Sequence, residues 1–284
     1  MSKNHKVALF LPITYFVIMT GFLIWHGTWF SPDQFFVAAI LIVLVLGKSK
    51  QFIADWSIPI AFLLTYDYLR GWVPRLIQTA NIYPMINFDK FLFGSIPTNT
   101  LQAMLYSNGK VAWYDYLGTV LYMSHFIAPM LFGFIFWLKD RKLFKRYFLA
   151  LLLLSYLAFA TYIIFPAMPP WMAAQNGIIP EVFKVMDQVF TSFAKPVDLP
   201  SVYKFVGVNL VAAVPSLHAA YPFLTFLFLR RKYGYKALVF LPYLLGIWFS
   251  IVYMGEHYVF DIIVGVVYAA IIFGLVIYGH DKNY

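Results

Sequence analysis

The sequence predicts an all-α protein, a polytopic bundle of membrane-spanning helices. The 284-residue chain is 62% hydrophobic and only 12% charged, whereas soluble domains carry roughly 25% charged residues. Its mean hydropathy is +0.74. Apolar runs close to the roughly 20 residues needed to cross a bilayer recur along the whole chain. The chain has no cysteine, which excludes disulfides, zinc–thiolate sites and cysteine nucleophiles.

The first apolar run follows a charged start that contains Lys3 and Lys6, but no small-residue cleavage site comes after it. We therefore expect an uncleaved membrane helix rather than a signal peptide. The second run is short, and the sequence leaves open whether it crosses completely. The expected spans are 8–26, 34–47, 52–69, 113–138, 146–166, 216–230, 237–254 and 258–279.

Two long connectors, 70–112 and 167–214, contain Pro, Asn and Gly together with amphipathic stretches. Within the second connector, Ile178–Phe193 interleaves charges with Val, Phe and Met. We expect this segment to lie along the membrane interface. A plain solvated loop is the alternative.

The charges predict a topology. Eight spans place both termini on one side, and 14 of the 21 Lys and Arg residues fall in the short loops and tails of that side. The positive-inside rule then puts the termini in the cytoplasm. The net charge of +9 is thus mainly a topology signal, and a nucleic-acid partner is not expected. The ends of several spans converge on the extracytoplasmic side.

His257 and Asp261 lie four residues apart at the start of the last span, so they share one helix face. A histidine nucleophile needs one nitrogen lone pair aimed at the electrophile and the opposite N–H held by an acceptor. A carboxylate one helical turn away satisfies that need. The alternative is a pair that only caps the helix.

Val214-Pro215-Ser216-Leu217-His218 stands at the start of the sixth span. Proline suits the first position of a helix, and the amides that follow it, with the Ser216 hydroxyl, would bind phosphate. His218 would then be placed to protonate a leaving alkoxide. The alternative is a proline-started span with an incidental histidine.

Pro-Ser-x-His followed 39 residues later by His-x-x-x-Asp resembles the type 2 phosphatidic acid phosphatase superfamily. The resemblance implies a core of six helices after two extra spans, with residues 1–50 as N-terminal transmembrane helices and 51–284 as the catalytic membrane domain. It also implies that His257 attacks phosphorus to give a phosphohistidine, that Asp261 orients His257, and that His218 is the general acid.

The sequence departs from the broad family where a cation is expected six residues before the nucleophile, because Ile251 stands there. A narrower branch fits better. The chain resembles the inositolphosphotransferase-like group, which includes inositol phosphorylceramide synthases, in Tyr66-Asp67-Tyr68-Leu69-Arg70-Gly71, Trp113-Tyr114-Asp115, Ser124-His125-Phe126 and Thr161-Tyr162-x-x-Phe165-Pro166-x-x-Pro169-Pro170-Trp171. This resemblance implies that Arg70 binds the phosphate, with Arg75 as the second choice. Snorkelling of Arg70 at a helix end is the alternative.

Three further residues are candidates for the substrate pocket: His125, Tyr162 and Trp171. A histidine satisfied inside the bundle is the alternative for His125, and an interfacial anchor is the alternative for Trp171. The extracytoplasmic acids lack the paired spacing that would hold magnesium. We therefore expect neither a metal nor another cofactor.

The sequence thus predicts an integral-membrane lipid phosphatase or phosphotransferase. It would take a lipid phosphate ester in the outer leaflet and pass the group to water or to a polyol. A polyprenyl pyrophosphate phosphatase is the alternative within the same chemistry. A lipid transporter or scramblase is the alternative from another class, but the sequence shows no internal repeat of the kind that such proteins carry.

Overall fold

The computed structural model describes residues 39–44, 46–76, 80–192 and 210–281, together with positions 14, 17, 18 and 21. Nearly all of the predicted span 8–26, and residues 34–38 and 45 of the predicted span 34–47, therefore lie outside the described residues. The all-α prediction is confirmed, because the described residues contain helices and only isolated bridges. Five long helices form the bundle: α3 (Ser49–Leu76), α6 (Trp113–Lys139), α7 (Arg141–Ile164), α12 (Leu241–Tyr253) and α13 (Val259–Asp281), around the central α11 (Leu217–Tyr233).

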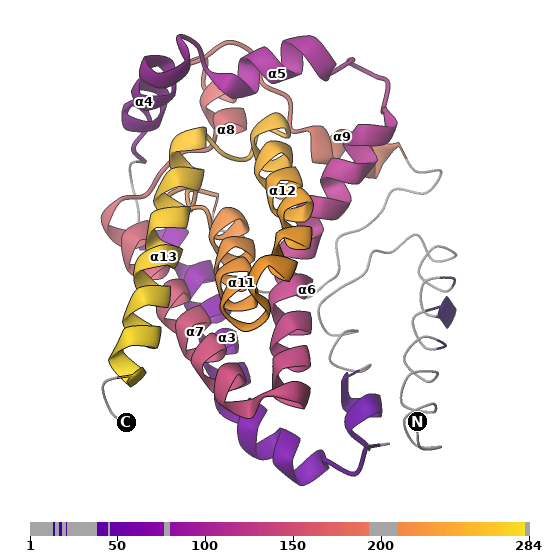
Figure 1. The fold of residues 1–284 in the computed structure, drawn as a ribbon. Coiled ribbons are helices and arrows are strands. Elements are labelled where there is room, and N and C mark those ends of the chain that lie inside the picture. The colour runs from indigo at the N-terminus through magenta and orange to yellow at the C-terminus, as the bar shows by residue number, and fades with distance from the viewer. Residues whose placement is uncertain are drawn as a thin grey trace.

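Helix α11 and helix α12 form a hairpin. The 3₁₀-helix η1 (Gly234–Phe240) joins them, and the two helices pack on each other. Helix α11 also contacts α6, α7 and α13, so it is the central helix of the bundle (Figure 1). The hairpin brings the start of α11 and the end of α12 to the same end of the bundle.

Three apolar helical stretches among the described residues are long enough to cross a membrane: α7, Leu217–Tyr253 and Val259–Gly279. Helix α6 makes a fourth if its two halves, Trp113–His125 and Ile127–Lys139, form one span. Helix α3 contains the predicted span 52–69 but is not in this set. Its aspartates, such as Asp55, and its tyrosines lower the hydropathy of its sequence.

Short helices from the two long connectors cover one end of the bundle. They are α4 (Tyr83–Phe93), α5 (Pro97–Leu105), α8 (Pro170–Gln175) and α9 (Val185–Thr191), and they gather around the ends of α12 and α13 in Figure 1. Gln102 of α5 fixes this layer: its amide nitrogen donates to the carbonyls of Phe183 and Tyr253, and its oxygen accepts from the Phe183 amide, each at 2.8 Å.

The segment 178–193 was expected along the membrane interface, and the apolar side chains of its helix α9 lie inside the protein instead. Val185, Met186, Val189 and Phe190 are buried in a cluster with Tyr253 and Met254. The interleaved charges marked an amphipathic helix, but its apolar face packs on other helices of the same chain.

Candidate active site

Ser216 lies directly before helix α11. Its backbone is extended, and its side-chain oxygen accepts a hydrogen bond from the Ala219 amide at 3.3 Å. This is an N-cap, because one of the first amides of a helix finds its acceptor in the preceding side chain. Pro215 therefore lies one residue before the cap, behind a cis Val214–Pro215 bond, and is not the first helical residue as the sequence suggested.

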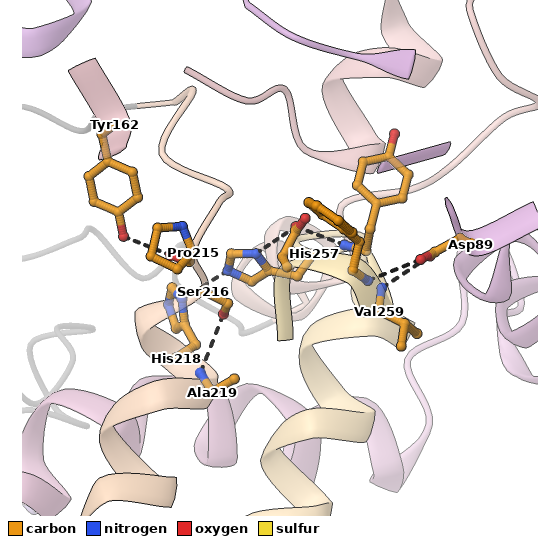
Figure 2. Close-up of polar contacts among 11 residues, drawn as sticks. Asp89, Tyr162, Pro215, Ser216, His218, Ala219, His257 and Val259 are labelled. Carbon is orange, nitrogen blue, oxygen red and sulfur yellow. Dashed lines mark hydrogen bonds and ion pairs between the residues drawn. The ribbon is translucent and has the colours of Figure 1, made fainter. Parts of the chain in front are cut away.

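The structure brings both motif histidines together. Nδ1 of His218 lies 3.1 Å from Nε2 of His257, and Nδ1 of His257 lies 3.1 Å from Oδ2 of Asp261. His257 and Asp261 are buried, and Figure 2 shows the two imidazoles meeting at the start of α11. One chain of polar contacts thus joins α11 to α13.

This series of contacts determines which ring nitrogen of His257 carries a proton. A carboxylate only accepts, so Nδ1 of His257 donates to Asp261 and Nε2 of His257 keeps its lone pair. That lone pair accepts from the Nδ1–H of His218. The nitrogen that a nucleophilic mechanism requires is therefore Nε2 of His257, with the ring of His218 directly beside it.

A tight turn presents His257. Gly255 adopts a φ of +82°, and a Cβ at this position would lie 2.9 Å from the Phe183 carbonyl oxygen. Glycine meets both demands, because it accepts positive φ and leaves room for the approaching backbone. The amides of Glu256 and His257 then both donate to the Ile251 carbonyl oxygen at 3.1 Å.

The helices that carry the two motifs are also in direct contact. The Ser216 amide donates to the Asp261 carbonyl oxygen at 3.1 Å. On the next turn of α13, a Cβ at Gly265 would lie 2.5 Å from the Ser216 carbonyl oxygen. The relative position of His218 and His257 therefore depends on a helix approach that only glycine permits.

Asp89 of α4 is a site residue that the sequence did not reveal. It is fully buried, and its two carboxylate oxygens accept from the Val259 and Phe260 amides at 3.0 Å each. These are the first two amides of α13, immediately before Asp261. An isolated aspartate 170 residues away gives no signal of such a contact, because no local pattern connects it to the helix.

The three predicted pocket residues have different surroundings. Tyr162 donates through its hydroxyl to the Pro215 carbonyl oxygen at 2.9 Å, so it supports the loop before α11. The buried ring of His125 packs on that of His218, with 3.7 Å between their centroids. Trp171 donates its backbone amide to the Gly255 carbonyl oxygen at 3.0 Å and holds its ring 5.0 Å from Nζ of Lys184.

The expected phosphate-binding arginines cannot be placed, since the side chains of Arg70 and Arg75 lie outside the described part of the structure. Another cation does lie near the site. Nζ of Lys184 is 3.9 Å from Oε1 of Glu256, the residue before His257. Burial raises the pKa of Glu256, and the positive charge of Lys184 opposes that rise.

Within the described residues, no group of three or more His, Cys, Asp or Glu side chains could hold a metal ion. What the site does offer is a nucleophilic nitrogen, a second imidazole in contact with it, a carboxylate behind it and a helix N-terminus beside it. This set of groups can form and break a covalent bond to phosphorus and can move the protons that go with it.

Comparison with known proteins identifies the family. The family model of the PAP2 superfamily matches residues 86–275. The chain is 28% identical to a phosphoinositol dihydroceramide synthase of Bacteroides thetaiotaomicron over 277 residues, which cover 93% of this chain and 89% of that protein. It is 26% identical over 128 residues to the inositol phosphorylceramide synthase catalytic subunit AUR1 of Saccharomyces cerevisiae, covering 41% of this chain and 30% of that protein.

No solved structure shows a significant match to the chain. The similarity to both synthases confirms the resemblance that the motifs suggested. The family match covers more than half of the chain, and the apolar helices α7 and α13, with the stretch Leu217–Tyr253, are long enough to span a bilayer. The chain is therefore an integral membrane enzyme of the PAP2 superfamily.

Proposed function

We propose that the protein transfers a phosphate-linked headgroup from a membrane lipid to an acceptor hydroxyl through a covalent intermediate on His257. The observation that carries this proposal is the continuous contact from His218 through His257 to Asp261. The names of the two synthases it resembles favour a lipid-linked phosphoinositol as the group transferred and a ceramide-type hydroxyl as the acceptor. Water or a free polyol would be a competing acceptor.

In the first half-reaction, Nε2 of His257 attacks phosphorus and the bond from phosphorus to the lipid oxygen breaks. His218, in its protonated imidazolium form, supplies the proton that the departing alkoxide takes up and becomes neutral. His257 becomes positively charged when it is phosphorylated, and Asp261 behind Nδ1 stabilises that charge. In the second half-reaction the acceptor hydroxyl gives its proton to His218, its oxygen attacks phosphorus, and the phosphorus–nitrogen bond breaks.

The phosphate also needs positive charge around its free oxygens. We assign this role first to Arg70 and then to Arg75, as the inositolphosphotransferase-like resemblance implies. Ser216 adds a hydroxyl: since its oxygen accepts from Ala219, its hydrogen points elsewhere and can be donated to phosphate. Lys184, whose Nζ lies 3.9 Å from Oε1 of Glu256, is a further positive charge in this part of the structure.

We further propose that the site faces the extracytoplasmic side and that both termini are cytoplasmic. The excess of Lys and Arg in the short loops of the opposite side supports this orientation. We also propose a domain boundary at about residue 50, with N-terminal spans in residues 1–50 and the catalytic membrane domain in residues 51–284. Lipid tails would then stay in the outer leaflet while the headgroup enters the site.

A donor–acceptor panel tests the proposal. Purified protein is assayed in detergent with phosphatidylinositol, phosphatidic acid or a polyprenyl pyrophosphate, each with and without dihydroceramide, while new phospholipid and inorganic phosphate are measured. We expect product from at least one donor, with His257→Ala inactive and His218→Ala slower by roughly 10²-fold or more. Normal turnover by folded His257→Ala would refute the mechanism. If the wild type forms no product from any donor, a transporter would be favoured.

A further inference from the structure

The first turn of α13 is held by a residue from another part of the fold. Asp89 of α4 accepts from the amides of Val259 and Phe260, both at 3.0 Å. Figure 2 shows its carboxylate facing the backbone nitrogens at the start of the helix. Asp89 is fully buried, so this contact belongs to the interior of the protein and not to its surface.

Helix α13 cannot supply this cap itself. The first amides of a helix lack partners within the helix and need an acceptor. Tyr258, the residue before α13, has no short acceptor side chain of the kind that caps a helix. Its own amide donates to Oδ2 of Asp261 at 2.9 Å, which leaves the next two amides to Asp89.

The same turn carries the carboxylate that orients His257. Oδ2 of Asp261 accepts from the Tyr258 amide and from Nδ1 of His257, and the Asp261 carbonyl oxygen accepts from the Ser216 amide. Any shift of this turn would therefore move Asp261 against both His257 and the start of α11. A misplacement of about 1 Å at a reacting centre can cost a factor of about 10² in rate.

We propose that Asp89 is a positioning residue for the transfer step: by holding the amides of Val259 and Phe260 it keeps Asp261 in contact with His257 and keeps Nε2 of His257 aimed at phosphorus. This inference rests on the proposed function. Asp89 touches neither substrate nor the reacting atoms in this arrangement, and it acts through the backbone of α13.

The contact predicts a defined kinetic effect. Asp89→Ala removes both acceptor oxygens, and we expect it to lower kcat by roughly 10- to 100-fold with little change in the KM for the lipid donor. Asp89→Asn keeps one acceptor oxygen, so it should fall between Asp89→Ala and the wild type. The asparagine variant also keeps the test valid if the alanine variant does not fold.

A double-mutant cycle separates positioning from general destabilisation. In an Asp261→Asn background there is no carboxylate to position, so adding Asp89→Ala should lower kcat by less than about twofold. An equal loss in both backgrounds would overturn the inference. Asp140→Ala is the matched control: Asp140 caps α7 through the Leu143 amide at 3.0 Å, and its loss should lower Tm without changing kcat.

Hydrogen exchange gives a readout that does not depend on activity. In Asp89→Ala, the amides of Val259 and Phe260 should exchange faster, while amides from the middle of α13 keep their protection. Unchanged exchange at these two amides would overturn the premise that Asp89 holds the first turn of α13. An active wild type with a fully active Asp89→Ala would overturn the positioning role alone, whereas a wild type inactive on every donor would overturn the proposed function as well.

Discussion

Adding one methyl group at Gly265 is expected to separate the two catalytic helices. The Cβ of an alanine there would lie 2.5 Å from the Ser216 carbonyl oxygen and 3.5 Å from the Ala220 Cβ. A carbon–oxygen contact normally needs roughly 3.3 Å, so α11 and α13 must move apart by about 0.8 Å. The obstacle is backbone, which cannot rotate away as a side chain could.

That displacement acts directly on the site. Ser216 lies two residues before His218, and Gly265 lies one turn beyond Asp261. The 3.1 Å contact between His218 and His257 joins α11 to the turn that leads into α13, so it would lengthen as the two helices separate. We expect Gly265→Ala to lower kcat by roughly 10- to 100-fold and to destabilise the fold by about 1–3 kcal/mol, the usual cost of overpacking.

The assay compares headgroup transfer and thermal unfolding in Gly265→Ala and Gly274→Ala. Gly274 lies on the same helix, and a Cβ there would meet no atom within 4 Å. The control should keep full activity and gain a little stability from the better helix propensity of alanine. A fully active Gly265→Ala, or equal losses in both variants, would refute the argument that this close approach sets the distance between the histidines.

Two further predictions concern charge. Burial is the main cause that raises the pKa of Asp89 from 3.8 to about 6, so between these values the folded protein holds a proton that the unfolded chain has released. The contribution of Asp89 to the free energy of unfolding is then greatest below pH 4 and is lost as the pH rises through 6. From pH 4 to pH 7, the Tm of the wild type should therefore fall relative to that of Asp89→Asn. Tm curves that stay parallel for the two proteins would contradict this. Arg70→Ala should lower kcat/KM by roughly 10²-fold if Arg70 neutralises the phosphate, whereas a larger loss from Arg75→Ala would transfer the role to Arg75.

The sequence was most informative where the chemistry is local. His257 and Asp261 are four residues apart, and the sequence predicted that they share one helix face. The contact forms, but His257 lies in the turn before α13, which begins at Val259, so the turn and not the helix periodicity brings the ring to Asp261. The contact with His218 required a second inference, that the ends of separate helices meet on one face. The hairpin of α11 and α12 provides that meeting.

Contacts that join distant segments could not be predicted in the same way. Asp89 caps α13 across 170 residues, and nothing in its neighbourhood in the sequence distinguishes it from a surface aspartate. Gly265 sits in an apolar run where glycine is common in membrane helices, so its close approach to Ser216 had no visible signal. The start of α11 was predicted two residues too early, because Pro215 was taken as the first helical residue, whereas Ser216 caps the helix and Leu217 begins it.

The contact between the two imidazoles has a consequence for how substrate enters. In this arrangement the Nδ1–H of His218 donates to the same lone pair of His257 that attacks phosphorus in the proposed mechanism. A phosphate group can reach Nε2 of His257 only when that hydrogen bond is exchanged for one to a phosphate oxygen. In the proposed mechanism His218, the general acid, is therefore within one side-chain movement of the leaving oxygen when Nε2 of His257 becomes available. The first turn of α13 must keep His257 and Asp261 in place during this exchange, because only the His218 side of the contact is replaced.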